Sequence, residues 1–156
     1  MRVRVIAVGT RMPEWVRSAC EDYLARLRAQ LPVSLLQIEP GPRASGAGAA
    51  RAVAAEGARL LAALRPGEHV AALDERGTQL STRELAAWLQ TRMQEGADLA
   101  FLIGGPDGLA ADVLGRSQLR WSLSRLTLPH ALVRVLLTEQ LYRAHSILSN
   151  HPYHRD

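Results

Sequence analysis

The C-terminal segment Asn150 to Asp156 carries two histidines, a tyrosine, an arginine and an aspartate within seven residues. The imidazoles of His151 and His154 can accept a proton near neutral pH. Tyr153 and Arg155 have flat side chains that can stack on a nucleobase. A zinc site is a weak alternative, because the two histidines are three residues apart outside any expected helix and have no cysteine partner. The segment therefore indicates proton transfer or base binding, and we expect no metal.

A glycine-rich turn, Gly104 to Gly108, follows the apolar run 98–103. Glycines let a backbone approach a ligand closely, and ligands of open α/β sheets bind beyond the carboxyl ends of the strands. The turn lacks the G-x-G-x-x-G pattern, and the chain has no lysine for a Walker motif. These absences argue against ATP or GTP hydrolysis and weaken an NAD site. On these residues alone, a ligand site and an ordinary tight turn are about equally supported.

The segment Trp121 to His130 leaves an expected strand, crosses small hydroxyl residues and enters an expected helix at Pro129 or His130. Proline is favoured in the first turn of a helix. The free N–H groups at such a helix start could hold polar groups of a ligand. The more common alternative is a plain connection between a strand and a helix.

Composition limits the class of protein. The 156 residues are 47% hydrophobic, enough for a full core, and the net charge is +4. All 19 basic residues are arginines, whose planar fork suits phosphate and nucleobases, so a polyanionic partner is permitted. Cys20 is the only cysteine, which excludes a disulfide within the chain and fits a reducing compartment. With no signal-peptide pattern and no membrane-length apolar stretch, we expect a soluble, cytoplasmic protein.

Periodicity places these segments in a single domain over residues 1–156. Strands alternate with helices, which predicts an α/β fold with a mostly parallel sheet flanked by helices on both faces. The doubly apolar run 98–103 favours a strand buried on both sides. Ser81 and Glu84 have the spacing of a capping box. We expect strands at 2–8, 33–38, 69–74, 98–103 and 119–123, helices at 13–31, 49–64, 81–96, 109–114 and 130–148, a turn at 75–77 and a mobile loop at 41–48.

Together these segments resemble the RlmH family, SPOUT-class methyltransferases of 23S ribosomal RNA. The resemblance covers the whole chain, is loose only over residues 40–64, and is most specific in the C-terminal segment. The matching residues are Val8-Gly9-Thr10, Met12-Pro13, Leu73-Asp74, Leu102 to Leu109, Ser122-Leu123-Ser124, Leu126 to His130, Arg134, Glu139 to Ala144 and Asn150 to Arg155.

The resemblance implies a SPOUT-type fold with a C-terminal trefoil knot, a homodimer, and S-adenosylmethionine as methyl donor. The implied reaction is methylation at N3 of a pseudouridine in 23S rRNA, on the assembled ribosome. The alternatives are a SPOUT methyltransferase with another RNA target and a non-catalytic RNA-binding dimer of ribosome assembly. The implied donor-binding residues are Leu73, Gly104, Gly105, Leu123, Ser124, Arg125, Leu126, Thr127 and Leu128.

Roles in catalysis are hypotheses at this point. Tyr153 and Arg155 would orient the acceptor base and stabilise its developing anion, while His151 or His154 accepts the N3 proton. His130 is an alternative base, because it adjoins the donor-binding stretch. The RNA would be held by arginines of both subunits, for which Arg2, Arg4, Arg11, Arg17 and Arg143 are candidates.

Overall fold

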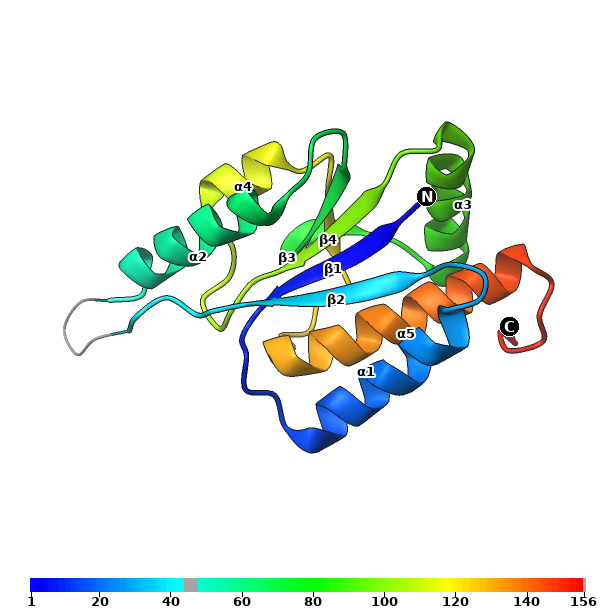
Figure 1. The fold of residues 1–156 in the computed structure, drawn as a ribbon, viewed down its shortest axis with the longest axis horizontal. Coiled ribbons are helices and arrows are strands. Elements are labelled where there is room, and N and C mark those ends of the chain that lie inside the picture. Colours follow the sequence, from blue (N-terminus) through cyan, green and yellow to red (C-terminus); the bar gives the residue numbers. More distant parts are fainter. Residues whose placement is uncertain (44–47, 156) are drawn as a thin grey trace.

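The computed structural model describes residues 1–43 and 48–155. Over these residues the chain forms one five-stranded sheet of order β2-β1-β4-β3-β5, and every pairing is parallel. Helices cover both faces, which confirms the predicted α/β class (Figure 1). The strands are β1 (Val3–Val8), β2 (Val33–Ile38), β3 (His69–Gln79), β4 (Leu99–Ile103) and β5 (Leu119–Ser122). The helices are α1 (Glu14–Leu27), α2 (Ala50–Ala63), α3 (Thr82–Glu95), α4 (Ala111–Arg116) and α5 (His130–Leu148).

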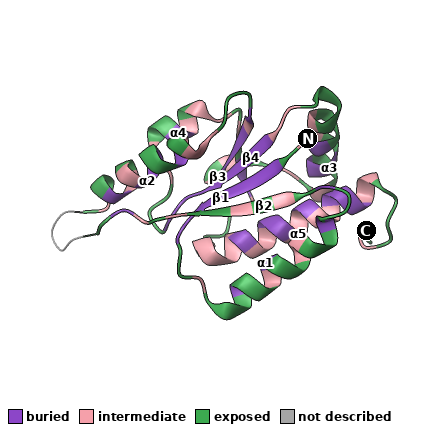
Figure 2. Cartoon of the chain, viewed as in Figure 1, coloured by how far each residue is buried: buried purple, intermediate pink, exposed green. Residues whose placement is uncertain are grey.

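The two central strands are buried along their whole length. Every residue of β1 and β4 is buried, as Figure 2 shows in purple. Successive side chains point to opposite faces of the sheet, so Val5 of β1 joins the core under α1, α3 and α5, while Ile6 joins the core under α2 and α4. The apolar run that indicated a doubly buried strand is therefore explained by helices on both faces.

Helix ends follow the local signals. Ser81 Oγ accepts a bond from the Glu84 N–H at 3.1 Å, and the Glu84 carboxylate accepts one from the Ser81 N–H at 3.0 Å, which is the predicted capping box. Gly96 ends α3 with a φ of 72°, a left-handed conformation that favours glycine. α5 has the predicted bounds.

The predicted turn at 75–77 lies inside a longer strand. β3 continues to Gln79, and both Leu73 and Thr78 pair with Trp121 of β5, so the intervening residues form a bulge. At Gly77 a β-carbon would lie 2.5 Å from the backbone of Arg120, so the bulge requires glycine there. The turn signal was correct locally, but pairing with β5 resumes after it.

Arg4 is a structural residue, and its predicted contact with RNA is wrong. It is 8% exposed, and its Nε and Nη2 donate to the two carboxylate oxygens of Glu68, both at 2.7 Å. Nη2 also donates to the carbonyl of Ala63 at 2.8 Å. Burial acts to raise the pKa of Glu68, but the bonds from Arg4 and the Arg65 N–H outweigh it and hold the pKa below its usual value.

Substituting Arg4 should therefore cost stability rather than RNA binding. We expect Arg4→Met to lower the free energy of unfolding by about 3 to 5 kcal/mol, because Glu68 would keep a buried charge without its partner. Urea denaturation measures this. Arg17→Met is the control, because Arg17 pairs with Glu14 on the exposed surface and should lose far less. Equal losses in the two variants would contradict the structural role of Arg4.

Two expectations stay open in the fold. The loop expected at 41–48 falls partly outside the described residues, and the trefoil knot remains a prediction. In the part of the chain that the structure describes, no helix combines the length and apolar character needed to cross a membrane.

Candidate functional site

The bulge of β3 and the segments that follow the carboxyl ends of β4 and β5 surround a cavity of about 530 Å³. Its volume is in the range of small-molecule sites, and it lies where ligands of parallel α/β sheets bind. The lining residues are Leu73, Asp74, Glu75, Arg76, Ile103, Gly104, Gly105, Pro106, Asp107, Gly108, Leu109, Leu114, Trp121, Leu123, Ser124, Leu126, Thr127, Leu128, His130 and Val133. We call this cavity the pocket.

The glycine turn forms one wall of the pocket. It begins where buried β4 ends, and it closes through a bond from the Gly108 N–H to the Gly105 carbonyl at 3.1 Å. A β-carbon at Gly104 would lie 2.8 Å from the carbonyl oxygen of Gly108, closer than such atoms approach in proteins. Gly108 has a φ of +83°. The turn therefore depends on glycine for its close fold and for its conformation.

The segment between β5 and α5 forms the opposite wall. Ser122 Oγ donates to the Ser124 carbonyl, and the Leu126 N–H donates to Ser124 Oγ, both at 2.9 Å. These bonds hold the connection in an ordered loop, and Leu126 remains 72% exposed at the rim. Eight of the nine predicted donor-binding residues line this one cavity, and Arg125 is exposed outside the lining.

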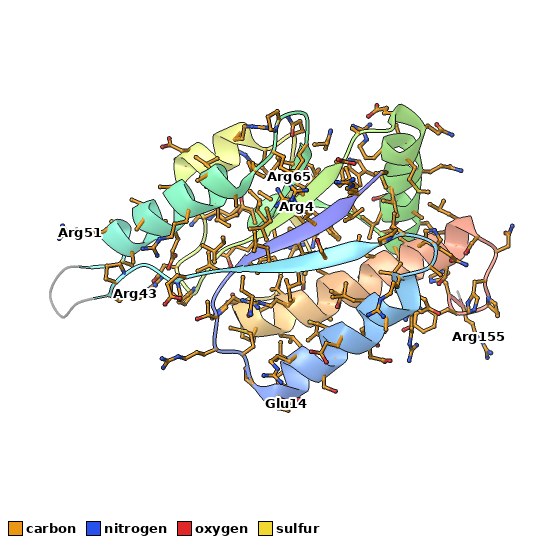
Figure 3. All side chains as sticks on the ribbon, in the orientation of Figure 1. Arg4, Glu14, Arg43, Arg51, Arg65 and Arg155 are labelled. Carbon is orange, nitrogen blue, oxygen red and sulfur yellow. The ribbon has the colours of Figure 1, made fainter. Side chains whose placement is uncertain are left out.

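An ionic network of Arg43, Glu56 and Asp107 holds the glycine turn in place, and the sequence did not predict it. Arg43, which is labelled in Figure 3, donates from Nε to the Asp107 carboxylate at 2.9 Å and from Nη1 to the Glu56 carboxylate at 2.8 Å. Glu56 is 2% exposed and also accepts the Gly41 N–H. A β-carbon at Gly105 would lie 3.3 Å from the Glu56 carboxylate. No sequence spacing could have found this network, because its members are joined only through space.

His130 lines the pocket at the first turn of α5. Burial, followed by the nearby guanidinium groups of Arg134 and Arg43, lowers the pKa of His130 below its usual value. The imidazole is therefore neutral at pH 7, and a neutral imidazole can accept a proton. This places one candidate base beside the predicted donor-binding residues.

The C-terminal segment packs against the far part of α5. The Tyr153 hydroxyl donates to the Glu139 carboxylate at 3.1 Å, and its ring meets that of Tyr142 with centroids 4.5 Å apart. The Arg143 guanidinium lies 4.8 Å from the Tyr153 ring centroid and pairs with Glu139 at 2.7 Å. Burial, a bond with Tyr23 and the Glu139 charge raise the pKa of Tyr153 well above its usual value. Tyr153 is thus a phenol that can donate a hydrogen bond, and it is unsuited to act as a base.

Comparisons with known proteins identify the family. Residues 1–154 match the family described as "Predicted SPOUT methyltransferase". The chain belongs to the SPOUT methyltransferase family. It is 53% identical, over the full length of both proteins, to a protein of Thiobacillus denitrificans named "Ribosomal RNA large subunit methyltransferase H". It is 52% identical, over 99% of the chain and 100% of the relative, to the protein of the same name from Chromohalobacter salexigens.

A solved structure supports the fold of this SPOUT methyltransferase. The "Probable Methyltransferase" from Bordetella pertussis Tohama I superposes with a TM-score of 0.57 over 92% of this chain and 95% of that one, at 21% identity. At this identity the likeness concerns the fold alone. The family resemblance found in the sequence is confirmed, together with the SPOUT-type α/β fold.

Within one chain of this SPOUT methyltransferase, the C-terminal segment lies away from the pocket and does not line it. α5 has 19 residues and begins at the pocket, so it spans about 27 Å at the usual rise before the segment starts. Figure 1 shows the C-terminal segment (red) beside the end of α5 that lies away from its start. Tyr153 bonds to Glu139, more than two helical turns from His130. The structure therefore brings His130 to the pocket, whereas His151, Tyr153, His154 and Arg155 are not among the lining residues.

Proposed function

We propose that this SPOUT methyltransferase transfers a methyl group from S-adenosylmethionine to N3 of a pseudouridine in 23S ribosomal RNA, on the assembled ribosome. The observation that carries the proposal is the full-length identity of about half to relatives named for methylation of large-subunit ribosomal RNA. The proposed substrate would place the protein in the cytoplasm, and residues 1–156 would act as one SPOUT domain.

The pocket fits the methyl donor. Its volume suits a small molecule, and its lining joins apolar side chains with the residues of the glycine turn. Gly104 and Gly105 line the pocket, and glycine lets the backbone there approach a ligand closely. We propose Leu73, Gly104, Gly105 and the loop from Leu123 to Leu128 as the donor-binding residues. S-adenosylmethionine would supply a methyl group already activated by its sulfonium, so the protein mainly aligns donor and acceptor.

The acceptor nitrogen carries a proton that must leave during transfer. His130 is a neutral imidazole at the pocket, and we propose that its ring accepts this proton. Tyr153 and Arg155 would orient the base and stabilise its negative charge, because a protonated phenol and a guanidinium both donate hydrogen bonds. His151 and His154 of the same segment are the alternative bases.

A second copy of the chain would complete the site. The C-terminal segment does not line the pocket of its own chain, and Tyr153 is held on Glu139 of α5, nine residues from His130. In a homodimer with two-fold symmetry, a surface of each subunit contacts the equivalent surface of the other, and such an arrangement can bring the segment of one subunit to the pocket of its partner. We therefore propose that each active site is built from both subunits.

RNA binding would use arginines near the pocket end of the molecule. Arg11 and Arg17 are exposed on either side of Trp15, which is itself 57% exposed. Arginine binds phosphate, and an exposed indole can stack on a base. Arg143 is engaged by Glu139 and Tyr153, so its role would be to hold the C-terminal segment.

The test combines donor binding with analysis of the product. We expect S-adenosylmethionine to bind the purified protein in a calorimetric titration. Mass spectrometry of 23S nucleosides should show that a deletion strain lacks N3-methylpseudouridine and that the gene restores it. Absence of donor binding would favour the non-catalytic RNA-binding dimer. Donor binding combined with unchanged 23S nucleosides in the deletion strain would favour another RNA target.

A further inference from the structure

Arg134 is a buried cation. It is 1% exposed and lies one helical turn after His130 on α5. Among residues 1–43 and 48–155, no carboxylate bonds to it, and its Nε has no hydrogen-bond partner. A methionine would fill similar space without the cost of taking a charge out of water. A fold that keeps such a charge at the edge of a ligand pocket suggests a functional reason.

The Arg134 guanidinium joins three elements at the carboxyl end of the sheet. Nη2 donates to the carbonyls of Val8 at 3.1 Å and Gly9 at 2.7 Å, where β1 ends. Nη1 donates to the side-chain oxygen of Gln37 in β2 at 2.8 Å. Because the planar fork serves all three acceptors at once, it fixes the start of α5 against β1 and β2.

Gly9 lies between Arg134 and His130. A β-carbon at Gly9 would lie 3.0 Å from Arg134 Nη2 and 3.9 Å from His130 Nε2, and the φ of this residue is +120°. The His130 ring therefore lies close to the Gly9 backbone that Arg134 holds. Any movement of that backbone would move the imidazole relative to the pocket.

We propose that Arg134 is a positioning residue for methyl transfer, which ties the Val8–Gly9 backbone to α5 and thereby holds the His130 imidazole at the pocket. The inference rests on the proposed function of His130 as the base. Arg134 itself is fully buried, so it acts through His130 and does not touch the substrate.

Electrostatics agree with this geometry. The charged groups that act on His130 are Arg134 on its own helix, Arg43 after β2 and Glu56 of α2, with Asp107 on the pocket wall paired to Arg43. Burial and the two arginines lower the pKa of His130, and Glu56 opposes them. Although burial lowers the pKa of Arg134, a guanidinium remains charged at neutral pH.

The first experiment follows the titration of His130 by NMR in histidine-labelled protein, with His130→Gln to assign the signal. Arg134→Met removes the positive charge, so the midpoint should rise by roughly one pH unit. The acidic limb of the methylation rate should shift upward by the same amount. Arg92→Met is the matched control: Arg92 lies 3.3 Å from His69 Nδ1 and lowers the pKa of His69, so this variant should move His69 and leave His130 unchanged.

A second variant keeps the test decisive if Arg134→Met does not fold. Arg134→Lys retains the charge but loses the planar guanidinium that donates to three acceptors at once. The rate of single-turnover methylation should therefore fall about tenfold, while donor affinity is retained. In a His130→Gln background, Arg134→Lys should lower the single-turnover rate by less than about twofold, because Arg134 acts through the His130 side chain that is already missing.

Two results would overturn the inference. One is a folded Arg134→Met protein with an unmoved His130 midpoint, and the other is an equal cost of Arg134→Lys in both backgrounds. The NMR titration needs no RNA, so it still reports on Arg134 and His130 if the wild-type protein methylates nothing. Absence of methylation by the wild-type protein would refute the proposed function and leave the inference about Arg134 testable.

Discussion

Gly104→Ala should abolish measurable binding of S-adenosylmethionine and lower methyl transfer by at least about 100-fold. The added β-carbon would lie 2.8 Å from the carbonyl oxygen and 2.9 Å from the carbonyl carbon of Gly108. These are backbone atoms, so no side-chain rotation can relieve the contact, and the turn must open. An opened turn changes the wall of the pocket against which the donor is proposed to lie. Calorimetry measures the binding, and single-turnover transfer to ribosomes measures the reaction.

Gly115→Ala is the matched control for this variant. Gly115 lies in α4, and nothing lies within 4 Å of a β-carbon placed there. Alanine favours a helix more than glycine does, so this protein should be at least as stable as the wild type and should bind the donor normally. If folded Gly104→Ala protein binds the donor as tightly as the Gly115→Ala protein, the glycine turn is not the donor site.

Two inactive variants should restore activity when they form mixed dimers. Gly104→Ala damages the pocket and Arg155→Ala damages the C-terminal segment, and each homodimer should be nearly inactive. A mixed dimer contains one site with an intact pocket and an intact segment, provided that the two come from different subunits. With random pairing, co-expressed chains should recover roughly a quarter of the wild-type activity. Differently tagged chains allow the mixed dimer to be purified and assayed alone.

The control is a mixed dimer in which both chains carry a substitution in the C-terminal segment. Co-expression of Arg155→Ala with Tyr153→Phe leaves a damaged segment at every site, so recovery should be absent. A pocket-and-segment mixture that stays inactive, although the mixed dimer has formed, would refute a site shared between subunits. It would require the segment to act within its own chain, which the length of α5 makes difficult.

Local patterns in the sequence determined most of the elements. The apolar run at 98–103 indicated a doubly buried strand, and β4 is buried at every residue. Ser81 and Glu84 predicted the start of α3, and Gly96 its end. These predictions succeeded because capping and periodicity depend on neighbours in the chain, which a sequence displays directly. The bulge after Leu73 was misjudged because its continuation depends on pairing with β5.

Residue types and order also indicated the pocket. The turn beginning at Gly104 and the loop from Leu123 to Leu128 follow different strands, and both line one cavity. The carboxyl ends of parallel strands meet at one edge of the sheet, so their following loops converge. That rule is general, and it required only that the strands be recognised.

Only the tertiary structure decided which of the catalytic candidates lies at the pocket. The sequence placed His130 and Tyr153 on the same list of catalytic candidates, but Tyr153 bonds to Glu139, nine residues along α5 from His130, and only His130 lines the cavity. The sequence offered Arg4 as a candidate RNA contact and Arg134 as a residue that matches the family, and it showed the surroundings of neither. Arg4 is buried against the carboxylate of Glu68, and Arg134 is buried against the backbone carbonyl of Gly9 at the end of β1. Such contacts join residues far apart in the chain, so spacing carries no signal for them, and only the packed fold determines where each charge lies.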